Sequence, residues 1–315
     1  MPSLPRSIAA FLVLLLLIVA AAPAGAAQPR AVQGRIDLPA VLQQPSALQG
    51  EWGFAWQEFV DPHWKQLPAQ SFAPVPASWN ELAADGKPPG PDGWGSYVLQ
   101  VDCPAGSALA VEAVGQRTAS RLFVNGELVA AHGDVGASAQ ASRAAVHTRI
   151  PVSREFACPL RITLHVSNFE HRAGGFVRPL AAAPADLLAR ERERGVGYAT
   201  TLLATHLLTA VGALYFFLVR PRERVALVYG LFSVAMAVYT DMIGERLLLR
   251  PLPGYELGWV PYMRVEYLAW IASMALFLLT LRGLFPNEIH RRFAQAVVAT
   301  LGVAAAAVVV LPPAI

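Results

Sequence analysis

The sequence predicts an all-β domain of the jelly-roll or β-sandwich type, followed by a multi-pass α-helical membrane bundle. Three observations lead to this fold class. Residues 28–183 contain short β-branched and aromatic runs separated by Gly, Pro and Asn turns, without a long helical period. Residues 196–315 contain four apolar stretches, each long enough to cross a bilayer. Residues 1–27 have the composition of a cleavable export signal.

The export signal is predicted from its three regions. Arg6 supplies a positive charge, residues 8–22 are apolar and uncharged, and Ala24-Gly25-Ala26 offers small side chains for cleavage. So short an apolar segment favours cleavage over a membrane-spanning helix, although a retained anchor is the alternative. We therefore expect residues 28–183 in the periplasm of a bacterium, attached to the inner membrane by residues 196–315.

Four segments of the exported part carry strand signals: residues 96–103, 109–114, 121–130 and 161–168. In the last segment apolar and polar side chains alternate, which predicts a strand with one buried face. The apolar set is Ile162, Leu164 and Val166, and the polar set is Thr163, His165 and Ser167. Asn125-Gly126 divides residues 121–130 into a hairpin, because both residues tolerate the positive φ angles of a type I′ turn.

Two cysteines, Cys103 and Cys158, both lie in the exported part. Each is followed by proline and stands at the edge of a predicted strand. An oxidising compartment allows such a pair to form a disulfide. Two unpaired, buried thiols are the alternative, since the sequence does not show how far apart the two Cα atoms are.

Several residues of this domain are candidates for ligand binding. Trp79 and Trp94 are expected in loops, where an indole can stack on a sugar ring, whereas packing in the core is the alternative for any single Trp. Asn168, His171 and Arg172 precede two consecutive glycines and can hydrogen-bond a polyol or an anion. For these three the alternative is a turn at the end of a strand, in which the side chains satisfy local backbone groups.

The membrane part holds four predicted spans: residues 196–219, 225–243, 259–281 and 293–311. Two loops with three arginines each fall on the cytoplasmic side if the β-domain is outside, as the positive-inside rule prefers. These arginines are Arg220, Arg222 and Arg224 after the first span, and Arg282, Arg291 and Arg292 between the third and fourth spans. Residues 184–195, which contain three further arginines on the outer side, are expected to form a short linker helix that begins at Pro184.

Four ionisable residues lie in or at the ends of the predicted spans: His206, Asp241, Arg264 and Glu266. Ionisable groups in membranes are costly and are often functional. The alternative for Asp241, Arg264 and Glu266 is an anchor at the membrane interface, and for His206 it is a neutral ring bonded to a neighbouring helix.

The composition excludes several classes of protein. The net charge is +3 and the basic residues do not gather in a run, so nucleic-acid binding has no support. The seven histidines lack metal-ligand spacing, and we expect neither a metal nor a cofactor. Neither half contains a catalytic motif, so we expect no enzymatic activity within these 315 residues.

An ordered set of short segments resembles a known family. The segments of the exported part are LQGEW (48–52), VPASW (75–79), GSY (95–97), LFVNG (122–126) and VSNFEHRAGG (166–175), and those of the membrane part are RVEYL (264–268) and LFPNE (284–288). They are similar to the bacterial seven-transmembrane receptors with diverse intracellular signalling modules. That family has a periplasmic jelly roll that resembles the galactose-binding-like domains of β-galactosidase-type glycosidases.

The resemblance implies a sensory receptor for a carbohydrate or a related small molecule, with seven helices and a cytoplasmic cyclase or kinase. This chain has four predicted spans, so we expect its membrane domain to be incomplete and any cyclase or kinase module to lie in a missing carboxyl-terminal part. The alternative is a membrane-anchored protein that binds or acts on glycans without a signalling output. The expected partners are the lipid bilayer and a periplasmic ligand, and a homodimer is a possible assembly.

Overall fold

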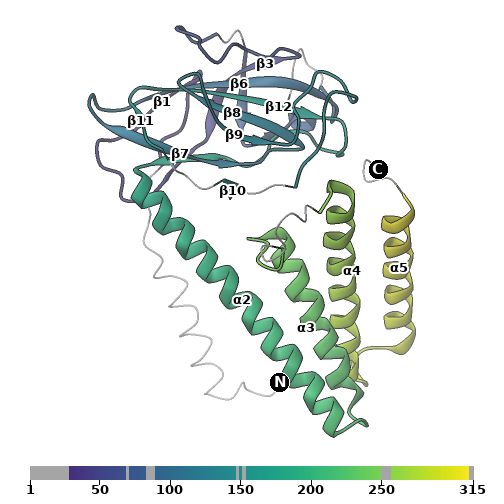
Figure 1. Ribbon diagram of the computed structural model, residues 1–315. Coiled ribbons are helices and arrows are strands. Elements are labelled where there is room, and N and C mark those ends of the chain that lie inside the picture. Colours follow the sequence, from purple (N-terminus) through teal and green to yellow (C-terminus); the bar gives the residue numbers. More distant parts are fainter. Residues whose placement is uncertain are drawn as a thin grey trace, which may run out of the picture.

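A computed structural model of the chain describes residues 28–68, 71–82, 89–146, 149–150, 154–249 and 257–311. The predicted export signal, residues 1–27, lies outside the described residues. The β-strands form a layered domain at one end of the molecule, and four long helices extend from beneath it (Figure 1).

The first sheet of the β-domain has seven strands within the described residues. They are β1 (Arg35–Asp37), β3 (Gly50–Trp56), β4 (Ser71–Val75), β6 (Gly93–Asp102), β8 (Ala119–Val124), β9 (Glu127–His132) and β12 (Leu160–Asn168). The order is β4-β3-β6-β12-β8-β9, with every pair antiparallel, while β1 pairs with β6 in parallel. The long central pair β6–β12 joins segments that are some 60 residues apart in the chain.

The second sheet has five described strands: β2 (Ser46–Leu48), β7 (Ala108–Val114), β10 (Arg149–Ile150), β11 (Phe156–Ala157) and β14 (Leu180–Ala183). Its order is β10-β7-β14-β2, with β11 also on β7. A short antiparallel pair, β5 (Ala77–Ser78) with β13 (Gly175–Phe176), lies beside the two sheets. The predicted β-sandwich or jelly-roll type of this domain is thus confirmed at the level of layered antiparallel sheets.

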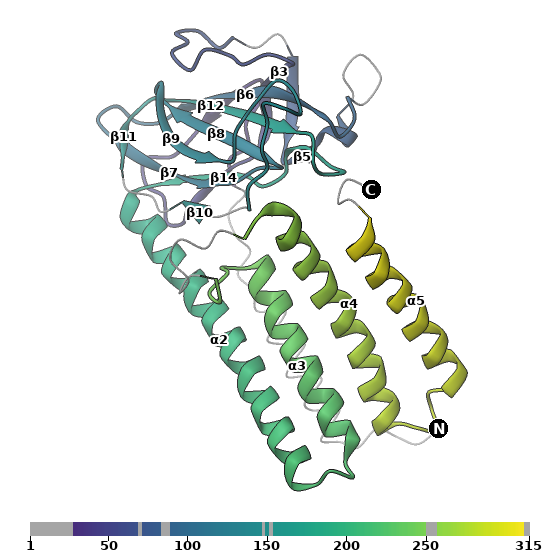
Figure 2. The same cartoon turned by 45° about the vertical axis from the view of Figure 1, so that its right-hand side comes forward.

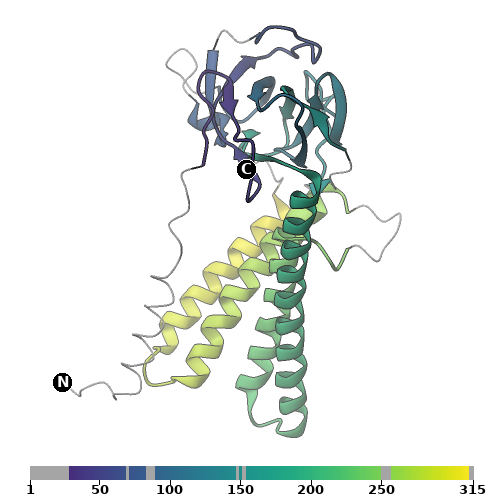
Figure 3. The ribbon, with the colours of Figure 1, turned by 90° about the vertical axis from the view of Figure 1, so that its left-hand side faces the viewer.

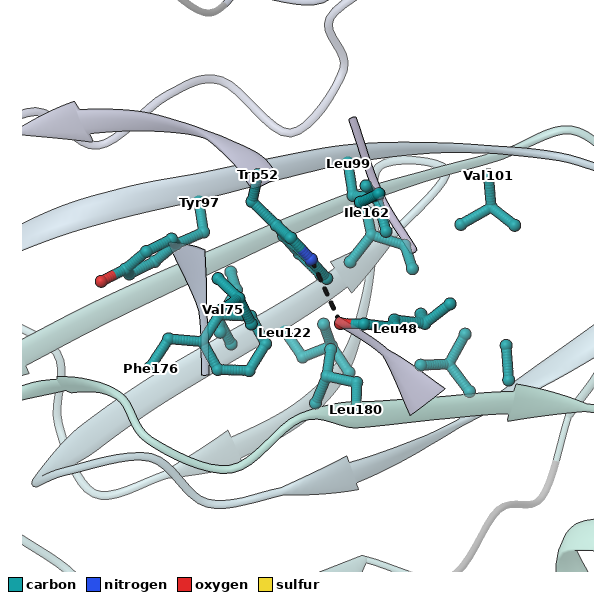
Figure 4. Packing of buried hydrophobic residues seen from close by; sticks show 14 of the residues in the cluster. Leu48, Trp52, Val75, Tyr97, Leu99, Val101, Leu122, Ile162, Phe176 and Leu180 are labelled. Atoms are coloured by element: carbon teal, nitrogen blue, oxygen red, sulfur yellow. Dashed lines mark hydrogen bonds between the residues drawn. The ribbon is translucent and has the colours of Figure 1, made fainter. Parts of the chain in front are cut away.

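Side chains from both sheets interdigitate in one core, as in other packed sheet pairs. Trp52 from β3 is fully buried, and its Nε1 donates to the carbonyl of Leu48 in β2 at 3.2 Å (Figure 4). Its ring meets that of Phe176 edge-on, with centroids 4.9 Å apart, and Phe176 in turn lies 5.3 Å from the ring of Tyr97. Large aromatic side chains therefore fill the centre of the domain.

Both faces of β12 are buried, although its sequence alternates. The predicted apolar face points into the core, with Ile162, Leu164 and Val166. The polar face is covered by the loop after β3. There Trp64 Nε1 donates to Thr163 Oγ1 at 2.8 Å, and His165 Nε2 donates to the carbonyl of Val60 at 2.9 Å. Buried polar groups need such partners, which explains why this face tolerates hydroxyl and imidazole groups.

The predicted hairpin at Asn125-Gly126 is confirmed. It joins β8 to β9, and the two turn residues have φ angles of 52° and 87°. A type I′ turn requires positive φ at both positions, and this pair adopts it at low cost. Nearby, Cys103 at the end of β6 and Cys158 before β12 form a disulfide, with their Cα atoms 5.8 Å apart.

The four helices are α2 (Ala185–Val219), α3 (Arg224–Ile243), α4 (Trp259–Leu284) and α5 (Arg291–Val310). They lie side by side in chain order, as one layer (Figure 2). By length and composition all four are able to cross a membrane, as expected of a membrane protein. Their bounds follow the four predicted apolar stretches closely.

The predicted linker, residues 184–195, is not a separate helix but the beginning of α2. This helix has 35 residues and is about 52 Å long, well beyond the hydrocarbon layer of about 30 Å. Its charged first turns stand between the β-domain and the apolar part, which gives a continuous helical connection between the two (Figure 3).

Candidate ligand sites at the junction of the β-domain and the helices

The β-domain is fixed to α2 by an apolar contact. Leu188, in the first turns of α2, is only 2% exposed and packs against Ala110 of β7 and Ala183 of β14. The backbone N–H of Ala185 also donates to Glu155 Oε1 at 2.7 Å. Burying a leucine side chain stabilises a contact by about 2 kcal/mol, so Leu188 anchors α2 to the second sheet.

A second contact joins the β-domain to α4. Ala144 and Val146, from the loop after β9, pack against the apolar cluster around Trp259 and Met263. The imidazole of His171 lies edge-on to the indole of Trp259, with centroids 6.0 Å apart. The two contacts thus hold opposite sides of the junction.

A cavity of about 820 Å³ lies at this junction. It is bounded on the β side by residues 131–134 and 143–146, and on the helix side by α2, by residues 243–249 and by the start of α4. Six charged residues line it: Arg143, Arg178, Arg192, Arg246, Asp134 and Glu245. Its volume is within the range of small-molecule sites, and its lining comes from both parts of the chain.

An ion pair crosses the helix side of this cavity. Arg192 Nη2 on α2 lies 3.0 Å from Glu245 Oε2, which stands in the connection after α3. Their side chains are 22% and 12% exposed, so solvent screens the pair less than a surface ion pair. The pair ties the outer end of α2 to the α3–α4 connection.

The predicted membrane residue Asp241 is not in the cavity lining but supports the α3–α4 connection that lines the cavity. Its two carboxylate oxygens accept from the N–H groups of Leu247 and Leu248, at 2.7 and 3.1 Å. Arg246 is buried beside it, donates to the carbonyl of Met242 at 3.3 Å, and contacts Tyr262. Asp241 therefore holds the α3–α4 connection in place, which is a structural role.

The other three predicted membrane residues are not in the cavity lining either. His206 is half-buried in the middle of α2, and Arg264 and Glu266 are half-buried on α4. Glu266 lies beside the Tyr262 hydroxyl, while the buried Nε of Arg264 has no hydrogen-bond partner in the described part of the chain. The four residues do not form one polar site.

A second, more open groove of about 460 Å³ lies on the β-domain itself. It is lined by Pro76, Ala77, Ser78, Asn80, Glu81, Arg117, Arg172, Ala173 and Val177. The predicted residue Arg172 is exposed here, so the structure places one of the five predicted ligand residues in a cavity.

The predicted loop positions of the two indoles are wrong. Trp79 is fully buried rather than in an open loop; its Nε1 donates to Tyr97 Oη at 2.8 Å, and its ring lies 5.0 Å from that of Trp56. Trp94 is not in a loop but in β6, where it pairs with Ser167 of β12, and it lines neither cavity. The flanking glycines of Trp94 suggested a turn, but the register with β12 overrides that local signal.

Asn168 and His171 are also structural rather than ligand contacts. Asn168 Nδ2 donates to the carbonyls of Pro91 and His171, and Asn168 Oδ1 accepts from the His171 N–H, so the amide closes the turn after β12. The following glycines approach an indole and not a ligand, since a methyl group at Gly174 would lie 2.5 Å from Trp79 Cε3. The turn interpretation, left open by the sequence, therefore holds for Asn168 and His171.

Two buried histidines of the β-domain, His165 and His171, predict acid sensitivity. Burial lowers the pKa of His165 and of His171 below the ordinary value of 6.5. The unfolded chain then binds more protons than the folded one, so the free energy of unfolding falls as the pH drops below that value. We expect a lower Tm at about pH 5.5 than at about pH 7.5. Replacing both histidines by glutamine is expected to flatten this dependence; an unchanged slope would contradict it.

Sequence reasoning missed most of the charged cavity lining. Arg192 belongs to the run of arginines before the first span that opposes the positive-inside rule. That exception was the available signal of a special role for Arg192, because in the predicted topology the positive-inside rule disfavours an arginine at this position. Arg143 and Glu245 carried no signal, since only the packing of the β-domain on the helices places both in the lining of one cavity.

No protein-family model matches the chain, and no curated protein matches it. Among solved structures, the chain is similar to a β-glucuronidase of Faecalibacterium prausnitzii, with 17% identity and a TM-score of 0.33, over 46% of this chain and 32% of the other. The chain is also similar to Ruminococcus gnavus β-glucuronidase, with 16% identity and a TM-score of 0.32, over 46% of this chain and 30% of the other. A third similar structure is a GH2 β-galacturonidase of Eisenbergiella tayi, with 14% identity and a TM-score of 0.30, over 45% of this chain and 25% of the other.

These similarities correct one expectation from the sequence. We expected no enzymatic activity from the lack of catalytic motifs, but the solved structures similar to this chain are glycosidases. We therefore withdraw that expectation. The matched part spans a third or less of each of these three enzymes.

Proposed function

We propose that the protein is a membrane-bound receptor that binds a small periplasmic molecule, such as a carbohydrate or a related compound, between its β-domain and its helices. The observation that carries the proposal is the 820 Å³ cavity, because its lining is divided between the two parts. A ligand in this cavity contacts both, so its binding energy depends on their relative position. Differential contact of this kind is the requirement for a conformational signal.

The arrangement of the helices supports a multi-pass topology with the β-domain outside the cell. The α2–α3 and α4–α5 turns lie at the end of the helix layer opposite the β-domain (Figures 1 and 2). Both turns carry the arginines that favour the cytoplasm. The α3–α4 connection lies beside the β-domain, as a periplasmic connection would.

The proposed relay of a signal from the cavity to the far end of α2 uses the Leu188 contact and the Arg192–Glu245 ion pair. Leu188 fixes the second sheet to α2, and the Arg192–Glu245 pair fixes α2 to the α3–α4 connection. A ligand that changes the spacing across the cavity therefore shifts α2 relative to α3. Because α2 is one continuous helix, this shift reaches its far end near Arg220.

The Leu188 contact gives a test of the relay. We expect that replacing Leu187 and Leu188 by glycine leaves ligand binding in place but abolishes the response at the far end of α2. The chain is studied in nanodiscs with a panel of sugars, sugar acids and organic acids. Binding is read from hydrogen exchange of residues 131–146. The response is read from the labelling rate of Arg222→Cys, which is the only free thiol while the disulfide is intact.

The matched control is the pair Arg190→Gly and Glu191→Gly, at exposed positions of the same helix. It imposes the same helix cost of about 1 kcal/mol per glycine without removing the buried leucine. The control should retain the ligand-dependent labelling rate. A ligand-dependent change in labelling rate that persists in the Leu187/Leu188 variant, or ligand protection that never includes residues 131–146, would count against the receptor.

A second candidate function is a membrane-anchored protein that binds or acts on glycans without a signalling output. The open groove around Arg172 favours it, because that groove belongs to the β-domain alone. In the same labelling experiment this function predicts protection of the segments around Arg117 and Arg172, with no change at Arg222→Cys in any variant.

A further inference from the structure

We propose that the groove on the β-domain is an anion site, in which Arg117 and Arg172 bind the carboxylate of a small soluble acid. This site is separate from the cavity between the β-domain and the helices, and the inference does not depend on the receptor function. The ligand class is a hydroxy acid or a sugar acid, for the reasons given below.

The groove is built on a backbone held by hydrogen bonds. β5 pairs with β13, with Ser78 opposite Gly175, and the N–H of Gly175 donates to the carbonyl of Arg117 at 3.3 Å. Asn80 Nδ2 donates to the carbonyl of Arg172 at 3.1 Å. The Cα positions of the two arginines are therefore fixed by three chain segments that are far apart in sequence, which favours a preorganised site over a flexible surface.

The charges of the groove favour an anion. Arg117 is half-buried and Arg172 is exposed, and neither has an ion-pair partner within the part of the chain that the structure describes. Glu81 is the one carboxylate in the described lining, so a net positive charge remains. Two guanidinium groups on one groove bind a carboxylate through charge-assisted, bidentate hydrogen bonds, which are stronger than bonds between neutral groups.

The remaining polar groups favour a ligand that also carries hydroxyl groups. The Ser78 hydroxyl and the Asn80 amide stand in the same lining as the arginines. No Trp, Tyr or Phe is among the described lining residues, because the indole of Trp79 is buried beneath the groove. Recognition by stacking on a neutral sugar ring therefore has no platform here, whereas recognition of an acid with hydroxyl groups has both kinds of partner.

The site lies next to a contact between the β-domain and the helices. His171 is close enough to both arginines that their positive charges help to lower its pKa, after the larger effect of burial. The same imidazole packs on Trp259 of α4. A bound carboxylate offsets part of the arginine charge and so raises the pKa of His171, which gives a readout of binding that is separate from affinity.

The experiment uses the full chain in nanodiscs and three matched pairs of probes: gluconate with sorbitol, lactate with lactamide, and succinate with succinamide. Inorganic phosphate is a fourth arm. We expect the acids to bind and their neutral counterparts not to bind in titration calorimetry. Arg117→Gln and Arg172→Gln should each weaken binding about tenfold or more, the effect of losing one charged hydrogen bond. In the wild type, gluconate should raise the pKa of His171 measured by NMR.

Arg35→Gln is the matched control, because it removes the same charge from the exposed edge strand β1. It should bind gluconate like the wild type. The proposal is overturned if no acid binds better than its neutral counterpart, or if phosphate alone binds. Equal affinity in the Arg117 and Arg172 variants overturns it as well. A loss of acid binding with an intact response at Arg222→Cys separates this site from the receptor cavity.

Discussion

Replacing Trp79 by alanine is expected to lower the free energy of unfolding by about 3–5 kcal/mol, the range for deleting a large buried aromatic side chain. The indole is fully buried, packs on Trp56 and lies against the backbone of Gly174. The variant also removes the hydrogen bond to Tyr97, whose phenol is kept neutral because burial raises its pKa. A cavity and a lost partner then add to each other.

Trp94→Ala is the matched control, because the sequence analysis predicts the same ligand-binding role for both indoles. Trp94 is half-buried on β6, so its removal is expected to cost about 1 kcal/mol. Denaturant unfolding of the detergent-solubilised chain, followed by near-UV circular dichroism, measures both variants. If Trp79→Ala keeps the wild-type stability and loses only ligand affinity, then Trp79 is a ligand contact and its buried position is wrong.

The second large effect is expected from the disulfide. Replacing Cys103 and Cys158 by serine should lower the free energy of unfolding by about 4 kcal/mol, because the bond closes a loop of 55 residues in the unfolded chain. For a domain of this size, that corresponds to a fall in Tm of about 10 °C. The bond also ties the end of β6 to the turn before β12, the two strands that form the centre of the first sheet.

Thermal unfolding with and without reductant tests this expectation. Dithiothreitol should bring the wild-type Tm down to that of the double serine variant and should leave the variant unchanged. Equal Tm values for the wild type and the variant without reductant would show that the two thiols are not bonded.

Much of the fold was predictable because its signals are local. The alternation in residues 161–168 needs only a period of two to indicate a strand, and Asn125-Gly126 needs only its own backbone freedom to indicate the turn. The four helices follow from apolar stretches of about 20 residues, which is a count along the chain. The polar face of β12 escaped this reasoning, since the loop that covers it comes from Val60 and Trp64, about a hundred residues earlier.

The candidate sites were predictable only in part. Arg172 was found because a polar run before two glycines stood out, and the structure places it in a groove. The neighbours of Trp79 predict a loop, yet its side chain lies in the core, where its Nε1 bonds Tyr97 Oη and its ring packs on Trp56. Arg117 and Arg143 gave no signal, because a single arginine on the surface of a β-domain is indistinguishable in sequence from any other.

By itself, the sequence determined the division into a β-domain and four helices able to cross a membrane, together with the hairpin and the strand periods. These properties depend on neighbouring residues and on hydrophobic length, so they can be read without knowledge of distant contacts. Only the tertiary structure decided which side chains line a cavity and which fill the core. The Arg192–Glu245 pair and the Arg117/Arg172 groove are made by segments that meet through packing, and packing depends on the shape of the whole chain.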